Sequence, residues 1–151
     1  MASGEERFVA FRAALKQKGL KTTSQRDDIA RTFFASSKHL SIDDLYREVR
    51  DINPGVGYAT VYRTMKLLKD CEFAEEQHFA DGHTRYENAD VEEHHDHILC
   101  DDCGKIVEFA DESIERLQEE IAARLGFVLS HHRMELYGVC EPCRTKKQEE
   151  A

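Results

Sequence analysis

Two kinds of metal-ligating residue stand next to each other near the middle of the chain. His94-His95-Asp96-His97 offers imidazole and carboxylate groups, and the thiols of Cys100 and Cys103 follow almost at once. A second Cys-x-x-Cys pair, Cys140 and Cys143, lies far downstream. Because thiolates and nitrogen or oxygen ligands suit different metals and different tasks, the sequence predicts one metal that holds the fold and another that is sensed.

The four paired cysteines fit a single tetrahedral Zn²⁺. Each Cys-x-x-Cys turn can direct two sulfurs toward a metal at about 2.3 Å, and four protein ligands leave no open position for water or substrate. We therefore expect a structural zinc site formed by Cys100, Cys103, Cys140 and Cys143. A dithiol redox switch is the alternative, and oxidation that releases zinc would combine the two. Cys71 stands alone and is expected to be a small core residue.

The histidines and the aspartate alternate in a way that can serve two different sites. Along an extended segment, His95 and His97 point to one side and His94 and Asp96 to the other. Neither pair completes a coordination shell, so each needs ligands from elsewhere in the chain. The candidates are His39, Glu87 and Glu108 for the first pair, and Glu115 and His132 for the second. Shells of this type accept Fe²⁺, Mn²⁺, Co²⁺ and Zn²⁺, and affinity alone does not choose among them.

Composition and charge divide the chain into two unlike halves. Its 151 residues are 40% hydrophobic, which suits one or two ordinary globular domains. The N-terminus lacks the features of a signal peptide, and no stretch approaches the roughly 20 apolar residues of a membrane span, so we expect a cytoplasmic protein without a membrane partner. Residues 1–70 hold 13 Lys/Arg against 9 Asp/Glu, whereas residues 71–151 hold 8 against 21. The excess positive charge of the first half favours binding to phosphate groups, and the excess negative charge of the second favours binding to cations.

Helical periodicity and capping signals predict four helices in the first half. The first spans residues 5–18, and the second opens near Thr23 or Ser24 and breaks at Ser36-Ser37. The third has Ser41 as its N-cap and stops before Asn53, and the fourth spans residues 58–69. The last of these would bury an apolar stripe and expose Tyr58, Thr60, Tyr62 and Arg63, together with Lys66. Aromatic, hydroxyl and guanidinium groups on one exposed face are what reading of the DNA major groove requires, and an ordinary surface helix is the alternative.

Strand signals follow the four helices. Asp81-Gly82 predicts a hairpin between residues 72–77 and 84–87, and helices followed by such a wing indicate a winged helix-turn-helix. Residues 89–96 are polar and charged without a hydrophobic period, so they are expected to form a hinge.

The remaining residues predict a small α/β unit. Strands are expected at 98–99, 105–109, 127–129 and 133–139, and a helix at 112–125 is expected to bury Ile114, Leu117, Ile121 and Leu125. The predicted fold class is therefore α+β, with a winged-helix DNA-binding domain over 1–88 and a small metal-binding α/β domain over 97–151. A core of about sixty residues is marginal, which favours a staple by metal, by dimerisation, or by both.

Several motifs together resemble the ferric uptake regulator (Fur) family of bacterial metal-dependent repressors over nearly the whole chain. They are Gly19-Leu20-Lys21-x-Thr23-x-x-Arg26, His39-Leu40-Ser41-x-x-x-Leu45-Tyr46, Ala59-Thr60-Val61-Tyr62-Arg63, the 94–97 cluster and the two Cys-x-x-Cys pairs. The resemblance implies a winged-helix domain, a hinge and a dimerisation domain. It also implies that Tyr62 and Arg63 read the major groove and that Lys21 reaches toward a minor groove.

The resemblance further implies two ligand sets besides the cysteines. The sensing site would bridge the two domains and use His39, Glu87, His95, His97 and Glu108. An additional metal site would use His94, Asp96, Glu115 and His132.

The expected function is a metal-responsive transcriptional regulator, most simply an Fe²⁺-dependent repressor of iron-uptake genes, with a structural Zn²⁺. Mn²⁺, Co²⁺ or Zn²⁺ could replace Fe²⁺, and sensors of peroxide, zinc, manganese or nickel in the same family are the alternatives. Peroxide sensors resemble the chain but place Asp where Glu87 and Glu108 stand, so the longer carboxylates favour iron. The expected partners are AT-rich palindromic operator DNA and a second copy of the chain, with a tetramer as a further possibility.

Two other classes of protein compete with this interpretation. A zinc hydrolase would need an open coordination position beside a general base, but no nucleophile or oxyanion motif accompanies the histidines, so we expect no enzyme. A metal-storage protein would leave the polar face of residues 58–69 unexplained.

Overall fold

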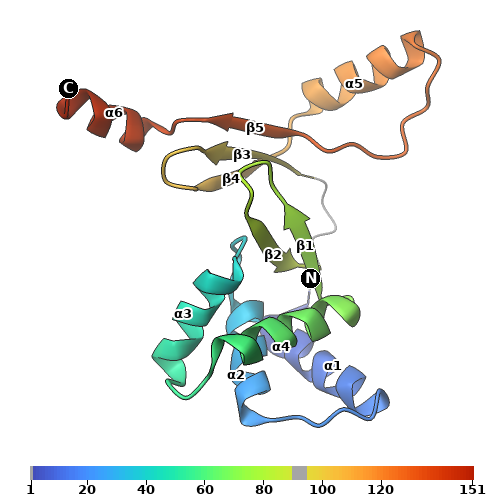
Figure 1. Ribbon diagram of the computed structural model, residues 1–151. Helices are drawn as coiled ribbons and strands as arrows, with labels where there is room; N and C mark the ends of the chain where they lie inside the picture. Colours follow the sequence, from blue (N-terminus) through green and yellow to red (C-terminus); the bar gives the residue numbers. More distant parts are fainter. Residues whose placement is uncertain (1, 90–94) are drawn as a thin grey trace. The chain divides into compact units, whose positions relative to one another are not determined.

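The computed structural model describes residues 2–89 and 95–151, and the chain divides into two compact units, residues 1–92 and 93–151 (Figure 1). The described residues mix helices and strands in both units. Most of the predicted hinge, residues 89–96, lies outside the described residues. Among the described helices, none combines the length and apolar character needed to cross a lipid bilayer.

Local sequence signals set the four helices of the first unit, which are α1 (Gly4–Gln17), α2 (Ser24–Ala35), α3 (Ile42–Ile52) and α4 (Tyr58–Asp70). Ser3 and Ser41 begin α1 and α3 as capping boxes, and Thr23 caps α2. Their side-chain oxygens accept hydrogen bonds from backbone N–H groups of the first helical turn, which have no acceptor within the helix. After α1 the chain reverses at Gly19, whose φ of 70° suits glycine.

The apolar faces of these helices meet in one core. Phe11 on α1, Phe34 on α2 and Phe73 before the wing pack edge to face, with ring centroids 5.7 to 6.2 Å apart. The core also contains Phe33 and a set of aliphatic side chains from all four helices: Leu15, Ile29, Leu45, Val49, Val61, Met65 and Leu68. Helices α1, α3 and α4 each pack on α2, so α2 is the centre of the unit.

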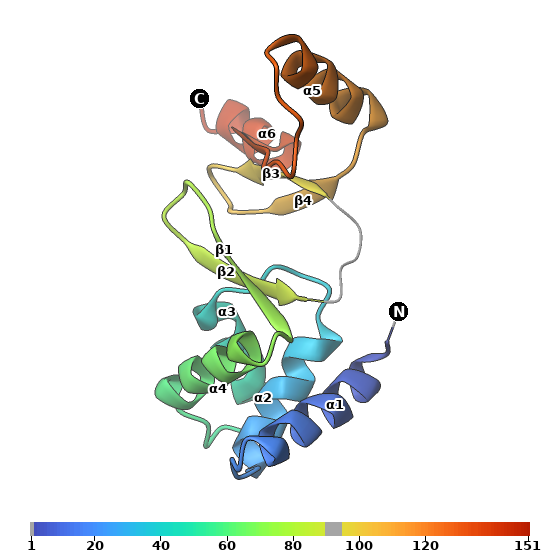
Figure 2. The same ribbon diagram turned by 90° about the vertical axis from the view of Figure 1, so that its right-hand side faces the viewer.

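A two-stranded wing completes the first unit. Strands β1 (Ala74–His78) and β2 (Thr84–Asn88) pair antiparallel, and the turn between them passes through Gly82 with a φ of 82°. Leu40 pairs with Tyr86 of β2 through two backbone hydrogen bonds of 2.9 and 2.7 Å, which ties the segment before α3 to the wing. Figure 2 shows the hairpin extending from the helical bundle of this unit. Helices followed by a paired wing form the predicted winged helix.

The second unit is built on a three-stranded sheet with the order β4-β3-β5. Strand β3 (Asp96–Cys100) pairs antiparallel with β4 (Ile106–Phe109) and parallel with β5 (Glu135–Gly138). A parallel pair needs a crossover, and α5 (Glu112–Arg124) supplies it. Helix α6 (Glu141–Glu149) follows β5 directly.

Two expectations for the second unit are wrong, and one helix was not predicted. Residues 127–129 form no strand. Leu117 and Ile121 on α5 and Leu125 just after it were expected to be buried, but they are 51%, 46% and 68% exposed. Helix α6 was not predicted because its highly charged sequence has no apolar period and opens with a proline in the first turn. Periodicity identifies an apolar face but does not say whether its partner belongs to the same chain, and no described strand or helix packs extensively on α5.

The aromatic core predicts a measurable cost of truncation. Replacing Phe33, which is 1% exposed, by Ala should destabilise the first unit by about 3–5 kcal/mol because the cavity cannot collapse fully. Thermal unfolding followed by circular dichroism measures the effect. The control is Ile52→Ala, where the side chain is 64% exposed and the change should stay within about 0.5 kcal/mol. Equal effects of the two changes would contradict the packing described here.

Candidate metal centres and nucleic-acid interface

Parallel pairing of β3 with β5 brings the two cysteine pairs together. Cys100 is the last residue of β3 and lies opposite Gly138, the last residue of β5. The carboxyl ends of parallel strands meet at one edge of a sheet, so the turn after β3 and the start of α6 lie side by side. Cys103 sits in that turn and Cys140 is the N-cap of α6. Residues about forty apart in the sequence thus share one corner of the unit.

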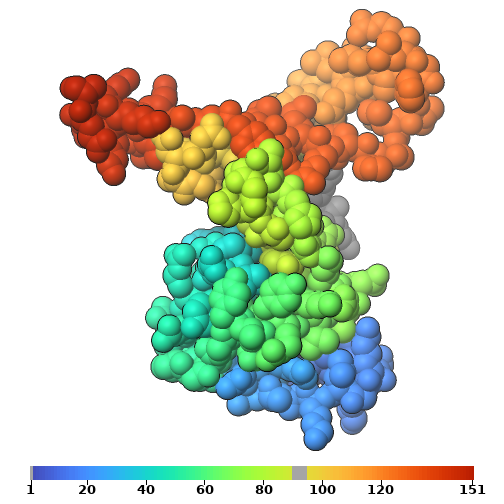
Figure 3. All heavy atoms as spheres, in the orientation of Figure 1, coloured from blue at the N-terminus to red at the C-terminus, as the bar shows by residue number. Residues whose placement is uncertain are grey.

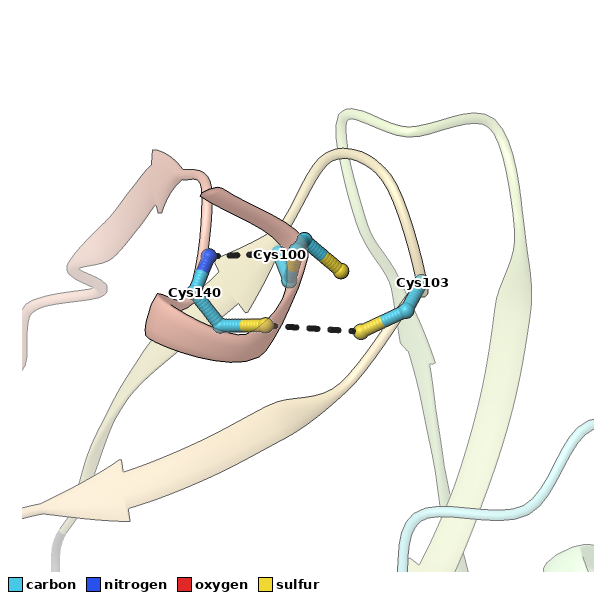
Figure 4. A group of neighbouring side chains, drawn as sticks. Cys100, Cys103 and Cys140 are labelled. Atoms are coloured by element: carbon cyan, nitrogen blue, oxygen red, sulfur yellow. Dashed lines mark hydrogen bonds between the residues drawn. The ribbon is translucent and has the colours of Figure 1, made fainter. Parts of the chain in front are cut away.

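The sulfur geometry fits a tetrahedral metal. The Sγ atoms of Cys100, Cys103, Cys140 and Cys143 all lie within 4.8 Å of one another. Figure 4 shows the sulfurs of Cys103 and Cys140 pointing toward each other, and the two are 3.8 Å apart. Four sulfurs at 2.3 Å from a tetrahedral centre would be separated by about 3.8 Å. The predicted four-cysteine cluster is therefore present, and its donor set suits Zn²⁺.

Hydrogen bonds shift the pKa values of two thiols of the cluster in opposite directions. Backbone N–H groups of Cys140 and Cys103 lower the pKa of the Cys100 thiol to about 6. In contrast, hydrogen bonding to Cys140 raises the pKa of Cys143 to about 12. A bound cation would release the remaining protons, because metals bind the deprotonated thiolate.

An ion pair that the sequence did not suggest lies beside the four-cysteine cluster. Lys147 of α6 lies 2.8 Å from a carboxylate oxygen of Asp102, in the turn between Cys100 and Cys103. This contact ties the second cysteine-bearing element to the first. The two residues are 45 positions apart, so no local pattern could have paired them.

Strand pairing in the first unit places an imidazole against a carboxylate. Because Leu40 is bridged to Tyr86 in antiparallel fashion, their neighbours His39 and Glu87 lie opposite each other. The Nε2 atom of His39 is 2.9 Å from Oε2 of Glu87. Gln77 of β1 donates a hydrogen bond to the other carboxylate oxygen and fixes its orientation. No sequence pattern indicated this supporting role of Gln77.

The register of the sheet in the second unit assembles a similar group. His97 of β3 lies opposite Glu108 of β4, and His95 precedes it by two residues, on the same side of the strand. The rings of His95 and His97 are 4.8 Å apart, and Nε2 of His95 is 3.6 Å from a carboxylate oxygen of Glu108. Two imidazoles and a carboxylate therefore converge on one face of β3.

Asp96 belongs to a separate group within the second unit. The Nε2 atom of His132 lies 3.3 Å from Asp96 and 3.4 Å from Glu115 of α5. Asp96 is 1% exposed, and a buried carboxylate requires a positive or hydrogen-bonded partner. These three residues could hold a cation together. His94, the fourth expected ligand, lies outside the described residues.

The exposed face of α4 carries the predicted DNA-reading residues. Val61, Met65 and Leu68 are buried in the core, whereas Tyr58 and Tyr62 are 46% and 54% exposed. Thr60 and Arg63 lie on the same helix, and Arg63 donates a hydrogen bond to the Thr60 hydroxyl at 3.5 Å. Lys21 lies in the turn between α1 and α2, where Arg26 donates to its carbonyl oxygen. The exposed face of α4 therefore carries hydroxyl and cationic groups that can form hydrogen bonds with bases.

Comparison with known proteins decides the family. The model of the ferric uptake regulator family matches residues 17–137. The chain belongs to the ferric uptake regulator family. It is 43% identical over 139 residues to the ferric uptake regulation protein of Campylobacter jejuni, an alignment that covers 91% of this chain and 88% of that protein.

Solved structures agree with this assignment. The ferric uptake regulator Fur of Helicobacter pylori, described as having three functional metal binding sites, matches with a TM-score of 0.82 at 32% identity and covers 95% of both chains. A zinc-bound manganese uptake regulator matches with a TM-score of 0.76 at 40% identity, over 86% of this chain and 98% of that one. The predicted fold class is confirmed, and this Fur-family member is a metal-responsive, DNA-binding transcription regulator rather than an enzyme.

The cysteine cluster yields a direct test. We expect purified protein to contain about one zinc per cluster, and Cys143→Ser should lose most of it because a tetrahedral site is left with three thiolates. The second unit should then unfold at a lower temperature. Metal analysis and calorimetry measure both effects. Cys71, which packs against the core of the first unit, provides the matched control, since Cys71→Ser should keep its zinc. Full zinc content in Cys143→Ser would contradict the assignment.

Proposed function

We propose that the protein is an Fe²⁺-dependent repressor that senses metal through His39, Glu87, His95, His97 and Glu108. One observation carries the proposal: each unit contains an incomplete ligand set of the same type. The first unit pairs His39 with Glu87 at 2.9 Å, and the second gathers His95 and His97 beside Glu108. Neither set fills a coordination shell alone, so one metal that takes ligands from both would complete them together.

Metal binding then acts as a population shift. A metal that accepts ligands from both units binds only the conformations in which the two sets converge, and it stabilises those conformations by its binding free energy. In a dimer, this fixes the separation of two recognition helices. Half-sites about one helical turn apart, roughly 34 Å, then become accessible to both helices at once.

The donor set and the relatives support iron. Imidazole and carboxylate ligands without sulfur suit Fe²⁺ but also Mn²⁺, Co²⁺ and Zn²⁺. Curated relatives at about 40% identity carry the name ferric uptake regulation protein. Manganese sensing is the second candidate, because a zinc-bound manganese uptake regulator shares 40% of its aligned residues with this chain.

Two further metals complete the proposed metal content. We assign a structural Zn²⁺ to Cys100, Cys103, Cys140 and Cys143, where it would hold α6 against the turn after β3. We assign an additional metal to Asp96, Glu115 and His132, with His94 as the fourth ligand. That metal would link α5 to β3 and would therefore help to hold the helix that carries the exposed apolar side chains Leu117 and Ile121.

The exposed apolar surface of the second unit supports a homodimer. Leu117, Ile121 and Leu125 expose their side chains on and just after α5, and Val128 is 98% exposed. Figure 3 shows α5 and the segment after it standing clear of α6, so α6 does not cover this surface. A contiguous apolar surface of this kind marks a protein interface. We propose a second copy of the chain as the partner, with a tetramer on DNA as the higher assembly.

The operator and the location follow from the same proposal. A dimer with two-fold symmetry binds a palindromic site. We propose an AT-rich site, because an AT-rich minor groove is narrow and attracts a cation such as Lys21. The protein would act in the bacterial cytoplasm, where the chromosome lies.

Metal-dependent DNA binding tests the sensing site. Fluorescence anisotropy should be measured anaerobically with Fe²⁺, Mn²⁺ or Zn²⁺, on operator DNA selected by the wild-type protein from a random pool. We expect His39→Ala and His97→Ala each to raise the metal concentration needed for binding at least about tenfold, because each removes a ligand.

The control is His83→Ala, which removes an exposed imidazole from the wing turn and should leave the metal requirement unchanged. A wild-type protein that binds no DNA with any of the three metals would overturn the proposed function. Binding that is equally tight with and without metal would overturn the sensing mechanism alone.

The dimer surface can be tested independently of DNA. Ile121→Lys places a charge in the middle of the apolar surface, so we expect the protein to become monomeric in sedimentation velocity experiments. Glu120→Lys alters the neighbouring charge without removing apolar surface and should remain dimeric. A dimer that survives Ile121→Lys at low micromolar concentration would show that another surface mediates the assembly.

A further inference from the structure

A basic groove lies along α1 in the first unit. It has a volume of about 690 Å³ and is bordered by α1, α2 and the turn that joins them. Among the residues that line it, Glu5 has the one carboxylate. The four cationic side chains are Arg12, Lys16, Lys21 and Arg31. The groove is therefore positive in a chain whose formal net charge is −9.

The two arginines are held in place by the wall of the groove. The guanidinium of Arg31 stacks 4.2 Å from the centre of the Phe8 ring and pairs with Glu5 at 3.2 Å. Arg12 lies 5.8 Å from the same ring and donates to the Thr22 hydroxyl at 3.4 Å. Stacking on the Phe8 ring orients the guanidinium of Arg31, and an ion pair with Asp27 at 3.8 Å orients that of Arg12, so less conformational entropy is lost when an anion binds.

The two lysines have no ion-pair partner among the described residues. Lys16 is exposed in the last turn of α1, and Lys21 is exposed in the turn that follows. Their ammonium groups border a groove whose arginines already have fixed directions. An anionic ligand that carries several separate charges would meet both lysines at once.

The groove adjoins the part of the molecule that meets DNA. In both Figure 1 and Figure 2 the turn between α1 and α2 lies at the same end of the first unit as the turn that precedes α4. Lys21 belongs both to this turn and to the groove. The phosphate backbone of a duplex held by α4 would therefore extend toward the groove, and its regularly spaced charges match a row of cations.

We propose that the groove holds the phosphate backbone of operator DNA, with Lys16 and Arg12 as phosphate-contacting residues. The inference rests on the DNA-binding function proposed above and extends its interface from α4 to α1. These contacts fix the position of the duplex and do not read its sequence. An acidic peptide is the competing occupant, since Val9 and Leu20 add apolar surface to the same groove.

The test is the salt dependence of DNA affinity for full-length Lys16→Gln in the presence of metal. Loss of one phosphate contact should make the slope of log K against log salt less negative by about 0.9. The loss of affinity should therefore be about 3.5-fold larger at 50 mM than at 200 mM salt. It should be the same for the selected operator and for an unrelated duplex of equal length, and Lys16→Arg should restore the wild-type slope.

Lys146→Gln is the matched control, because Lys146 is an exposed lysine of α6 outside the groove and should leave the slope unchanged. Arg12→Gln should repeat the effect of Lys16→Gln, with circular dichroism confirming that α1 remains folded. If wild-type protein binds DNA and Lys16→Gln keeps its slope, the groove takes another ligand and this inference alone fails. A loss confined to the operator would also overturn it. Wild-type protein that binds no DNA would overturn both the inference and the proposed function.

Discussion

Parallel pairing of β3 with β5 is the interaction on which the second unit depends. It aligns His97 with Glu135 and Cys100 with Gly138, and so brings the end of the unit back to its beginning. Without this pairing the two cysteine pairs would not lie at the same edge of the sheet. The connection through α5 would then no longer return the chain to a position beside β3. A short parallel ladder is weak on its own, because such strands normally need cover on both faces. A metal bound by four thiolates at the end of the ladder would supply the missing stability, since the complete four-thiolate site exists only when β3 and β5 are paired.

A second long-range contact performs the same task in the first unit. The bridge between Leu40 and Tyr86 holds the segment before α3 against the wing, and it sets His39 opposite Glu87. The carboxylate is further oriented by Gln77 from the neighbouring strand. In both units, therefore, a backbone ladder rather than a flexible loop positions the candidate ligands. This rigidity matters for a sensor, because a ligand set that is already ordered loses little entropy when the metal arrives.

Local signals predicted the first unit well and the second less well. Caps such as Ser41 with Asp44 and the apolar stripe of α4 act within a few residues, so the sequence alone was enough to place the helices. The strand expected at 127–129 is absent because an apolar run specifies burial but not the partner that buries it. The exposed face of α5 has the same origin, since its expected partner is a second chain. Long-range pairing could not be predicted either. Neither the bridge between Leu40 and Tyr86 nor the ion pair between Lys147 and Asp102 leaves a local pattern in the sequence.

Strand alternation explains how a few consecutive residues can contribute to several sites at once. On β3 and just before it, His95 and His97 share one face with Glu108, while Asp96 turns to the opposite side and meets His132. The same strand ends in Cys100, at the sulfur cluster. A one-residue shift in register would exchange the two faces and move every ligand to the wrong side. A metal bound by the sulfur cluster would oppose such a shift because it would fix the end of β3 against the start of α6. The structural site would then do more than stabilise the fold, since it would help to hold the register that keeps the two other ligand groups apart.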